Sequence, residues 1–440
     1  MKVAMIGAGY VGLVSGACFS EFGHEVICVD VDQRKIDMLE RGEIPIFEPG
    51  LDTLVASNVQ AGRLSFTTDL KSAVAESDAV FIAVGTPSRR GEGDADLSYV
   101  YQAAKDIAAA TDGTKVIVTK STVPVGTGAQ VKRILAEANP SAAFHVVSNP
   151  EFLREGAAIE DFMRPNRIVC GVESKYARDM MRELYRPLFL NETPIVFTSL
   201  ESSEMIKYAA NCFLATKITF INEIADLCEK VGADVQSVAR GIGLDRRIGN
   251  LFLHPGPGFG GSCFPKDIRA LAATAEAFDA PLHIVETVNS INENRKKAMA
   301  EKIIAAMGGD VTGRTIAILG VTFKPNTDDM RESPSLDIIP ALQKAGATIR
   351  ACDPEGMREA AELLPGIEWL DDPYDAMDGA DAVAILTEWN HYRALDKERM
   401  KSLLNRPLMI DLRNIYGVEE MEAAGFTYHS VGRMPVNAGA

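Results

Sequence analysis

Short apolar runs and helix-like stretches alternate along the first 197 residues. The runs are short and continuously apolar, as strands are when both faces of a sheet are buried. Strands that alternate with helices predict a parallel sheet covered by helices on both faces. We expect these strands at residues 3–6, 25–29, 79–84, 115–119 and 146–148.

The middle of the chain changes to long helical patterns. From residue 201 to about 230, apolar residues are spread around much of the helix circumference. They include Met205, Cys212, Phe213, Ile218, Ile221 and Leu227. A helix that is apolar on most sides is buried, and we expect this one to lie against another subunit. A second helical stretch, at about 282–307, is expected to connect to the next domain.

A second region of alternating strands and helices follows a cluster of glycines. Apolar runs recur there at residues 315–319, 348–352, 382–386 and 408–410. The alternation predicts a second α/β unit of the nucleotide-binding type.

The first apolar run leads directly into the glycine motif Gly7-x-Gly9-x-x-Gly12. In dinucleotide-binding domains the first glycine makes a tight turn, the second lets backbone N–H groups approach a pyrophosphate, and the third lets the helix pack closely. The second run ends in Asp30, near the spacing of about 20 residues at which an acid receives the ribose hydroxyls. An acid there repels a 2′-phosphate, so the sequence predicts NAD and not NADP. The alternative for Asp30 is a turn residue at a strand end.

A chain of 440 residues exceeds one ordinary hydrophobic core. The sequence therefore predicts an α/β fold of two Rossmann-like, doubly wound domains joined by a central helical dimerisation domain. We expect an NAD-binding domain at 1–197, a central domain at 198–308 and a C-terminal domain at 309–440. Unlike the first domain, the last lacks the glycine motif.

Composition and charge exclude several partners. The net charge is −16 and no basic run offsets it, so we expect neither nucleic acid nor an anionic membrane as a partner. No segment reaches 18 uninterrupted apolar residues, and glycines interrupt the apolar N-terminus, which argues against a membrane span and a signal peptide. The seven cysteines form no C-x-x-C pair, so we expect a cytoplasmic protein without disulfides or a metal site.

Hydroxyl and acidic side chains follow the strands of the first region. Thr86 and Thr122 come after the third and fourth apolar runs, at the sheet edge where doubly wound folds bind ligands. Helix capping is the alternative role for each threonine. After the fifth run, Glu151 and Glu155 lie four residues apart, and an exposed surface position is the alternative for both.

A glycine-rich loop ends at Cys263 and is followed by Lys266 and Asp267. Small residues let a bulky substrate approach the sulfur, and the lysine favours the thiolate over a thiol whose ordinary pKa is roughly 8.5. The arrangement indicates a nucleophile for covalent catalysis. Taken by itself, the loop favours the alternative, an ordinary turn with a small buried cysteine.

Lys207 and Asn211 are four residues apart and therefore share one face of the expected central helix. A lysine and an amide on a buried helix need a reason to be there, and an oxyanion site would supply one.

In the last region Lys324, Arg331 and Arg413 follow strands. They are the basic groups available for a second set of phosphates.

Several segments, spread over essentially the whole chain, carry a resemblance. They are residues 7–13, 149–156, 204–211, 258–267, 323–324 and 331–334. Together they resemble the UDP-glucose/GDP-mannose dehydrogenase family, and the run 255–261 is similar to the UDP-glucose members. The resemblance implies NAD-dependent oxidation of UDP-glucose to UDP-glucuronate for polysaccharide precursor synthesis. GDP-mannose and UDP-N-acetylmannosamine are the alternative substrates.

The resemblance also implies a mechanism with two oxidations at one site. The C6 hydroxyl becomes an aldehyde, the cysteine adds to it as a thiohemiacetal, and a second oxidation gives a thioester that water hydrolyses. The implied roles are nucleophile for Cys263, oxyanion stabilisation for Lys207 and Asn211, water activation for Asp267 with Lys207, and proton transfer for Glu151 and Thr122.

The binding residues follow from the same resemblance. Those implied for NAD are Gly7, Gly9, Val11, Gly12, Asp30, Lys35, Thr86, Thr122, Glu155, Lys266 and Arg331. Those implied for the nucleotide sugar are Glu151, Phe152, Leu153, Lys207, Asn211, Phe252, Gly256, Gly260, Lys324 and Arg413. Arg247 resembles an arginine that reaches the substrate of a neighbouring subunit, which makes a homodimer the minimum. A two-electron hydroxy-acid dehydrogenase and a non-catalytic nucleotide-sugar sensor are weaker alternatives, because neither needs the cysteine loop.

Overall fold

The computed structural model describes residues 1–87 and 95–437. The chain forms two compact units, the first made of residues 1–210 and 273–280 and the second of residues 211–272 and 281–440. Two helices, α9 (Leu200–Val231) and α11 (Phe264–Ala277), contribute residues to both units.

The first unit contains an eight-stranded sheet in the order β3-β2-β1-β4-β5-β6-β7-β8. The strands are β1 (Lys2–Ile6), β2 (Glu25–Val29), β3 (Leu64–Thr67), β4 (Ala79–Ile82), β5 (Thr114–Thr119), β6 (Ala143–Ser148), β7 (Ile168–Val172) and β8 (Ile195–Thr198). The first six are parallel, and β7 pairs with β6 in the antiparallel sense. The order 3-2-1-4-5-6 of the parallel part is that of Rossmann domains.

Helices cover both faces of this sheet. They are α1 (Tyr10–Glu21), α2 (Gln33–Glu40), α3 (Leu51–Gln60), α4 (Leu70–Glu76), α5 (Ser98–Ala109), α6 (Thr127–Ala138), α7 (Ala158–Met163) and α8 (Lys175–Leu184). Successive residues of β1 belong to two different core clusters, because neighbouring side chains of a strand point to opposite faces. The continuous apolar runs are thus explained by burial on both sides.

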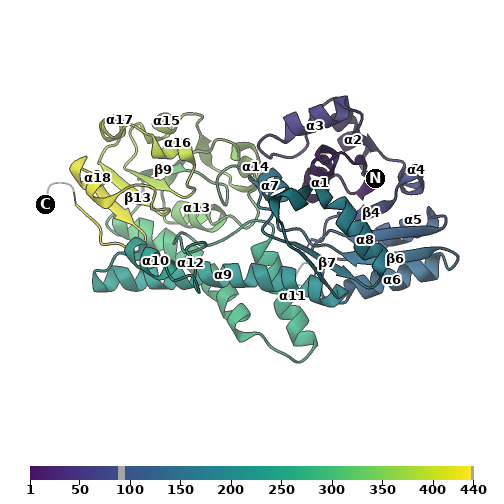
Figure 1. The fold of residues 1–440 in the computed structure, drawn as a ribbon. Helices are drawn as coiled ribbons and strands as arrows, with labels where there is room; N and C mark the ends of the chain where they lie inside the picture. Colours follow the sequence, from purple (N-terminus) through teal and green to yellow (C-terminus); the bar gives the residue numbers. More distant parts are fainter. Residues whose placement is uncertain (88–94, 438–440) are drawn as a thin grey trace. The chain divides into compact units, whose positions relative to one another are not determined.

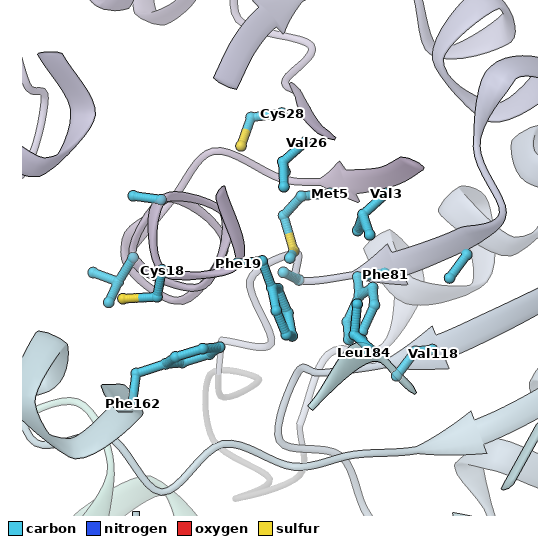
Figure 2. Packing of buried hydrophobic residues seen from close by; sticks show 14 of the residues in the cluster. Val3, Met5, Cys18, Phe19, Val26, Cys28, Phe81, Val118, Phe162 and Leu184 are labelled. Atoms are coloured by element: carbon cyan, nitrogen blue, oxygen red, sulfur yellow. The ribbon is translucent and has the colours of Figure 1, made fainter. Parts of the chain in front are cut away.

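Aromatic packing holds α1 and α7 to one face of the sheet, and the two helices lie side by side in Figure 1. Figure 2 shows Phe19 of α1 between Phe162 of α7 and Phe81 of β4. Its ring centroid lies 5.0 Å from that of Phe162 and 5.3 Å from that of Phe81. This contact fixes the helix that follows the glycine motif.

The second unit contains a six-stranded parallel sheet in the order β11-β10-β9-β12-β13-β14, which repeats the order 3-2-1-4-5-6. Its strands are β9 (Thr315–Leu319), β10 (Thr348–Cys352), β11 (Ile367–Trp369), β12 (Ala382–Ile385), β13 (Leu408–Asp411) and β14 (Thr427–Ser430). The expected fold class, two doubly wound α/β units with central helices, is confirmed.

The helices of the second unit again lie on both faces of its sheet. They are α10 (Val235–Gly243), α12 (His283–Ala306), α13 (Ser335–Lys344), α14 (Met357–Leu363), α15 (Pro373–Met377), α16 (Asn390–Arg393), α17 (Lys397–Leu403) and α18 (Val418–Ala423). Among the described residues, no helix has both the length and the apolar character needed to span a bilayer.

Candidate active site

The turn between β1 and α1 has no room for a side chain at Gly7 or Gly12 but is open at Gly9. Gly7 has a φ of +104°, and a Cβ on Gly12 would lie 1.8 Å from the carbonyl oxygen of Gly7. At Gly9, by contrast, a Cβ would meet no atom within 4 Å. The turn is therefore tight at its base and open at the helix N-terminus, as a pyrophosphate requires. These residues fit the dinucleotide that the sequence predicts.

Asp30 follows β2 and is tied to the same turn. Its carboxylate accepts hydrogen bonds from the backbone N–H of Ala8 at 2.9 Å and of Asp32 at 3.0 Å. The ammonium of Lys35 lies 3.6 Å from it. The structure thus brings together two of the residues predicted for the cofactor, Asp30 and Lys35.

Two further predicted cofactor residues meet at the carboxyl ends of β4 and β5. The hydroxyl of Thr86 donates to the carbonyl oxygen of Thr122 at 3.0 Å. Next to Thr122, the Ser121 hydroxyl donates to the carbonyl oxygen of Val84 at 2.6 Å. These bonds link the two loops at the edge of the sheet where the glycine turn lies.

Glu48 is a buried acid that the sequence analysis missed. Its carboxylate accepts a hydrogen bond from the Tyr10 hydroxyl in the glycine turn. It also accepts from the backbone N–H of Gly156 at 2.6 Å and of Ala158 at 2.7 Å. Glu48 therefore links the glycine turn to the loop that carries Glu155. In the sequence Glu48 is followed by proline and glycine, a pattern common to many turns, so nothing there marks it as a buried acid.

Glu151 and Lys207 form a buried ion pair in the first unit. The Lys207 Nζ lies 3.1 Å from Oε1 of Glu151, and both side chains are about 5% exposed or less. Phe152 lies beside the pair, with the Lys207 ammonium 5.3 Å and the Arg167 guanidinium 3.7 Å from its ring centroid. Three residues predicted from the sequence, Glu151, Phe152 and Lys207, thus lie together. Arg167, which the sequence did not single out, lies beside them.

In the second unit, Cys263 lies immediately before α11. Its carbonyl oxygen accepts from the Asp267 N–H at 2.9 Å, the first turn of the helix, and its Sγ lies 3.4 Å from the Ser262 hydroxyl. The N-terminus of a helix favours the thiolate form of a cysteine.

Cys263 is also the one partly exposed thiol of the seven, all of which lie within the described residues. Burial raises the pKa of Cys18, Cys28, Cys170 and Cys212 to about 12. Only Cys263 combines access to solvent with a helix N-terminus.

Asp267 gathers two other predicted residues. Its Oδ2 accepts from Asn211 Nδ2 at 2.6 Å, and its Oδ1 accepts from Lys266 Nζ at 2.6 Å. Asp267 itself is buried. The ammonium of Lys266 is therefore paired with Asp267, and the amide of Asn211 is fixed on the face of α9 that also carries Lys207 one turn earlier.

Helix α12 holds the glycine-rich loop, a contact that the sequence did not reveal. The side-chain amide of Asn292 accepts from the N–H of Phe259 at 2.9 Å and donates to its carbonyl oxygen at 3.0 Å. Arg295 Nε donates to the carbonyl oxygen of Gly256 at 2.6 Å. On the other side, a Cβ on Gly260 would lie 2.3 Å from the carbonyl oxygen of Glu332. The loop therefore tolerates only glycine there.

The residues predicted for the nucleotide sugar occupy several places in the second unit. Arg413 donates to the carbonyl oxygens of Leu386 at 2.7 Å and Phe323 at 3.0 Å, and its Nη1 would lie 3.2 Å from a Cβ on Gly256. Lys324 follows Phe323, with its ammonium 5.1 Å from that ring's centroid. The structure thus brings Arg413, Gly256 and the Phe323-Lys324 segment together.

Three other predicted residues have distinct surroundings. Arg331 is held by Asp329, whose Oδ1 lies 2.8 Å from both its backbone N and its Nε. Phe252 has a φ of +64°, a strained conformation for a bulky residue that clusters at functional sites. Arg247 is largely exposed and pairs with Asp245 at 2.5 Å.

Within the described residues, no group of three or more His, Cys, Asp or Glu side chains is arranged to hold a metal ion.

Two Rossmann-type units, a glycine turn with an acid after β2 and a thiol at a helix N-terminus define a nucleotide-dependent dehydrogenase. Comparison with protein families narrows this class. Residues 1–189, 201–294 and 317–418 match the NAD-binding, central and UDP-binding domains of the UDP-glucose/GDP-mannose dehydrogenase family. The chain therefore belongs to this family, and its cofactor is NAD.

Similar proteins span the whole chain. UDP-glucose 6-dehydrogenase of Rhizobium meliloti (strain 1021) is 64% identical over 435 residues, which cover 98% of this chain and 100% of that protein. UDP-glucose 6-dehydrogenase TuaD of Bacillus subtilis (strain 168) is 52% identical, with 99% and 94% covered. A UDP-glucose dehydrogenase from Pyrobaculum islandicum has a similar structure, with a TM-score of 0.88, 37% identity and 95% of each chain covered.

Replacing Asp30 with asparagine should weaken NAD binding and relax the preference for NAD over NADP. The amide keeps a hydrogen-bond acceptor but loses the charge that repels a 2′-phosphate. Because a hydrogen bond to a charged group contributes about 1.5–3 kcal/mol, we expect KM for NAD to rise roughly tenfold to a hundredfold. Steady-state kinetics with both cofactors measures this, with Asp37→Asn on α2 as the control. If the natural chain used NADP as well as NAD, Asp30 would not lie at the ribose.

Proposed function

We propose that this chain oxidises UDP-glucose to UDP-glucuronate in two NAD-dependent steps, as a source of polysaccharide precursor. The observation that carries the proposal is Cys263, the partly exposed thiol at the start of α11 beyond a loop too tight for side chains. The choice of UDP-glucose is supported by 64% identity to an enzyme named for that substrate. The run 255–261, which is similar to the UDP-glucose members, favours it over GDP-mannose, and UDP-N-acetylmannosamine stays the alternative UDP-sugar.

The proposed mechanism assigns a task to each residue. NAD, when bound, accepts a hydride from C6 in each of the two oxidations. Glu151, with Thr122, takes the proton of the C6 hydroxyl through water as the aldehyde forms. The Cys263 thiolate then adds to the aldehyde carbon and makes a thiohemiacetal. Lys207 and Asn211 stabilise the oxyanion that this addition creates.

Hydrolysis completes the reaction. Loss of the second hydride converts the thiohemiacetal to a thioester on Cys263. Asp267, acting with Lys207, positions and deprotonates the water that attacks the thioester carbon. The carbon–sulfur bond breaks, the thiolate of Cys263 leaves, and the product departs as a carboxylate. The substrate thus stays covalently bound between the two oxidations.

The binding residues are proposed from the same arrangement. The glycine turn, Val11, Asp30, Lys35, Thr86, Thr122, Glu155, Lys266 and Arg331 would hold NAD. Phe152, Leu153, Phe252, Gly256, Gly260, Lys324 and Arg413 would hold the nucleotide sugar with the catalytic residues. We keep the division into domains 1–197, 198–308 and 309–440, which the extents of the three family models support. The seven cysteines form no C-x-x-C pair, which suits a reducing compartment, and we place the enzyme in the cytoplasm.

An exposed apolar stripe on α9 supports a homodimer as the minimum assembly. Phe213, Phe220 and Leu227 recur every seven residues and are 65%, 49% and 56% exposed. Such a stripe lies on one helix face and is expected to be covered by another surface. A second copy of the chain is the occupant that we propose. The exposed Arg247 would then extend toward the substrate of the neighbouring subunit.

The function predicts that each UDP-glucose consumed yields two NADH, because the aldehyde is held on Cys263 between the hydride transfers. Absorbance at the NADH band, together with chromatography of the nucleotide sugars, measures the ratio. GDP-mannose and UDP-N-acetylmannosamine serve as comparison substrates and should react far more slowly. A ratio of one with free aldehyde in solution would contradict the covalent route.

Two substitutions at Cys263 separate the halves of the chemistry. Cys263→Ser replaces a good leaving group with a poor alkoxide, so an ester formed in the second oxidation should accumulate. Cys263→Ala should bind the substrate nearly as well and form no acid, because binding depends on the nucleotide contacts. Mass spectrometry after incubation with UDP-glucose and NAD should find an adduct on the serine variant alone. Near-normal UDP-glucuronate production by Cys263→Ala would make Cys263 a structural residue.

The dimer predicts that a charge in the α9 stripe causes dissociation. Phe220→Glu would place a carboxylate in an apolar interface, where an unpaired charge is strongly unfavourable. Sedimentation velocity should show a dimer for the natural chain and a monomer for the variant. Leu363→Glu on α14, at a leucine that is exposed to a similar extent, is the matched control and should remain dimeric. A natural chain that sediments as a monomer would overturn this assignment.

A further inference from the structure

A tight turn at residues 330–333 is anchored to the sheet of the second unit. The backbone N–H of Ser333 donates to the carbonyl oxygen of Met330 at 3.1 Å, which closes the turn. The Ser333 hydroxyl donates to the carbonyl oxygen of Val321 at 2.7 Å, two residues beyond the end of β9. Within this turn Glu332 has a φ of +53°, which is uncommon for a residue with a side chain. The 330–333 turn is therefore held in one particular conformation beside the sheet.

The backbone of this turn holds the glycine-rich loop just before Cys263. The N–H of Gly261 donates to the carbonyl oxygen of Arg331 at 2.8 Å. A Cβ on Gly260 would lie 2.3 Å from the carbonyl oxygen of Glu332. Two consecutive residues of the loop thus lie directly against two consecutive carbonyl groups of the turn. Cys263 follows two residues after Gly261.

The side chain of Glu332 holds the helix that begins just after Cys263. Its Oε1 lies 2.8 Å from Nη2 of Arg269 on α11, and both side chains are about one-third exposed. Glu332 is the one acid paired with Arg269 in the part of the chain that the structure describes. Both ends of the span 261–269 are therefore held by adjacent residues of one turn, and the thiol lies between them.

Glu332 also lies near Lys296 on α12, but that lysine does not depend on it. The Lys296 ammonium lies 2.9 Å from Glu293, 3.8 Å from Glu332 and 3.9 Å from Asp337. Without Glu332 it would keep two acidic partners. The contact that only Glu332 makes is the one with Arg269.

We propose that Glu332 is a positioning residue for the nucleophile Cys263, because its ion pair with Arg269 holds α11 against the same turn that fixes the glycine-rich loop. An ion pair exposed to this extent adds little to stability. Its value is geometric, since reacting atoms must come within about 3–3.5 Å, and a displacement of about 1 Å can cost roughly a hundredfold in rate. The proposal rests on the covalent role proposed above for Cys263.

A displaced thiol should affect the two oxidations differently. The first hydride leaves C6 without any help from the sulfur, whereas the second leaves from the thiohemiacetal. If the thiolate adds slowly to the aldehyde carbon, the aldehyde more often departs before the carbon–sulfur bond forms. The number of NADH formed per UDP-glucose consumed then falls below two. This ratio is independent of the amount of folded enzyme, so a purely structural role of Glu332 would leave it unchanged.

The test compares Glu332→Gln, Arg269→Gln and the double variant with Glu293→Gln. Glu293 is a matched control, because its side chain is 39% exposed against 37% for Glu332 and it pairs with the same Lys296. Its ion pair stays within α12, where both residues lie. The measurements are kcat, KM, and the NADH ratio at early times, before released aldehyde can rebind. Borodeuteride added at the end converts released aldehyde to UDP-glucose deuterated at C6, which mass spectrometry counts.

The natural chain and Glu293→Gln should give a ratio of two and no deuterated UDP-glucose. In Glu332→Gln and Arg269→Gln the ratio should fall to about 1.5 or lower, with aldehyde accounting for the difference, and kcat for the acid should fall roughly threefold to tenfold. KM for UDP-glucose should change less than about twofold, since binding does not depend on the sulfur. The double variant should resemble either single variant, because both substitutions remove the same ion pair.

A ratio of two in Glu332→Gln would overturn the proposal, and so would an equal fall in Glu293→Gln. If Glu332→Gln does not fold, Glu332→Gly decides, because glycine adopts a φ of +53° without strain and lacks the carboxylate. A ratio of two in that variant would again contradict the proposal. A natural chain that itself gives a ratio of one would instead remove the proposed covalent function, and this proposal with it.

Discussion

Both candidate binding regions depend on one constraint, the close approach of backbone to backbone where no Cβ can fit. In the first unit Gly12 lies against the carbonyl group of Gly7, so α1 starts close to the end of β1. In the second unit Gly260 lies against the carbonyl group of Glu332. Because glycine lets the backbone pass this closely, the N–H groups of the glycine turn and the Cys263 thiol lie at the surface of tight turns. A methyl group at either place would displace the loop and the residues beyond it.

Buried charges are the second feature common to the two units. The first unit holds Glu151 with Lys207, and the second holds Asp267 with Lys266 and the amide of Asn211. Removing one partner of such a pair costs about 3–5 kcal/mol, yet apolar residues of similar size would often be as stable. Charges of this kind therefore do little for the fold. They are consistent with a site that must move protons and hold an oxyanion away from bulk water.

The two Rossmann-type units use the same strand end differently. Asp30 after β2 accepts from the N–H groups of Ala8, in the glycine turn, and Asp32. Asp353 after β10 has the same topological position, but it accepts from the N–H groups of Val321 at 2.7 Å and Gly356 at 2.8 Å and from the Trp389 indole at 3.2 Å. The carboxylate of Asp353 is thus satisfied by backbone donors and by an indole, whereas Asp30 accepts from backbone N–H groups and lies near the ammonium of Lys35.

The sequence by itself determined the features whose cause is local. Continuous apolar runs predicted β1, β2, β9 and β10 to within a residue, because strands buried on both faces need apolar side chains at every position. The glycine motif and the Cys263 loop were also recognisable, since their chemistry requires neighbouring residues in a fixed order.

Short strands such as β3, β11 and β14 gave no such signal, because more exposed and less exposed positions alternate along them and their runs are not continuously apolar. Only the tertiary structure revealed Glu48 and Arg167 beside the candidate residues of the first unit, and Asn292 beside the glycine-rich loop of the second. Glu48 and Gly156 are 108 residues apart in the sequence. A buried polar residue is explained by the partner that satisfies it, and folding brings that partner from a distant part of the chain, so no local pattern marks it.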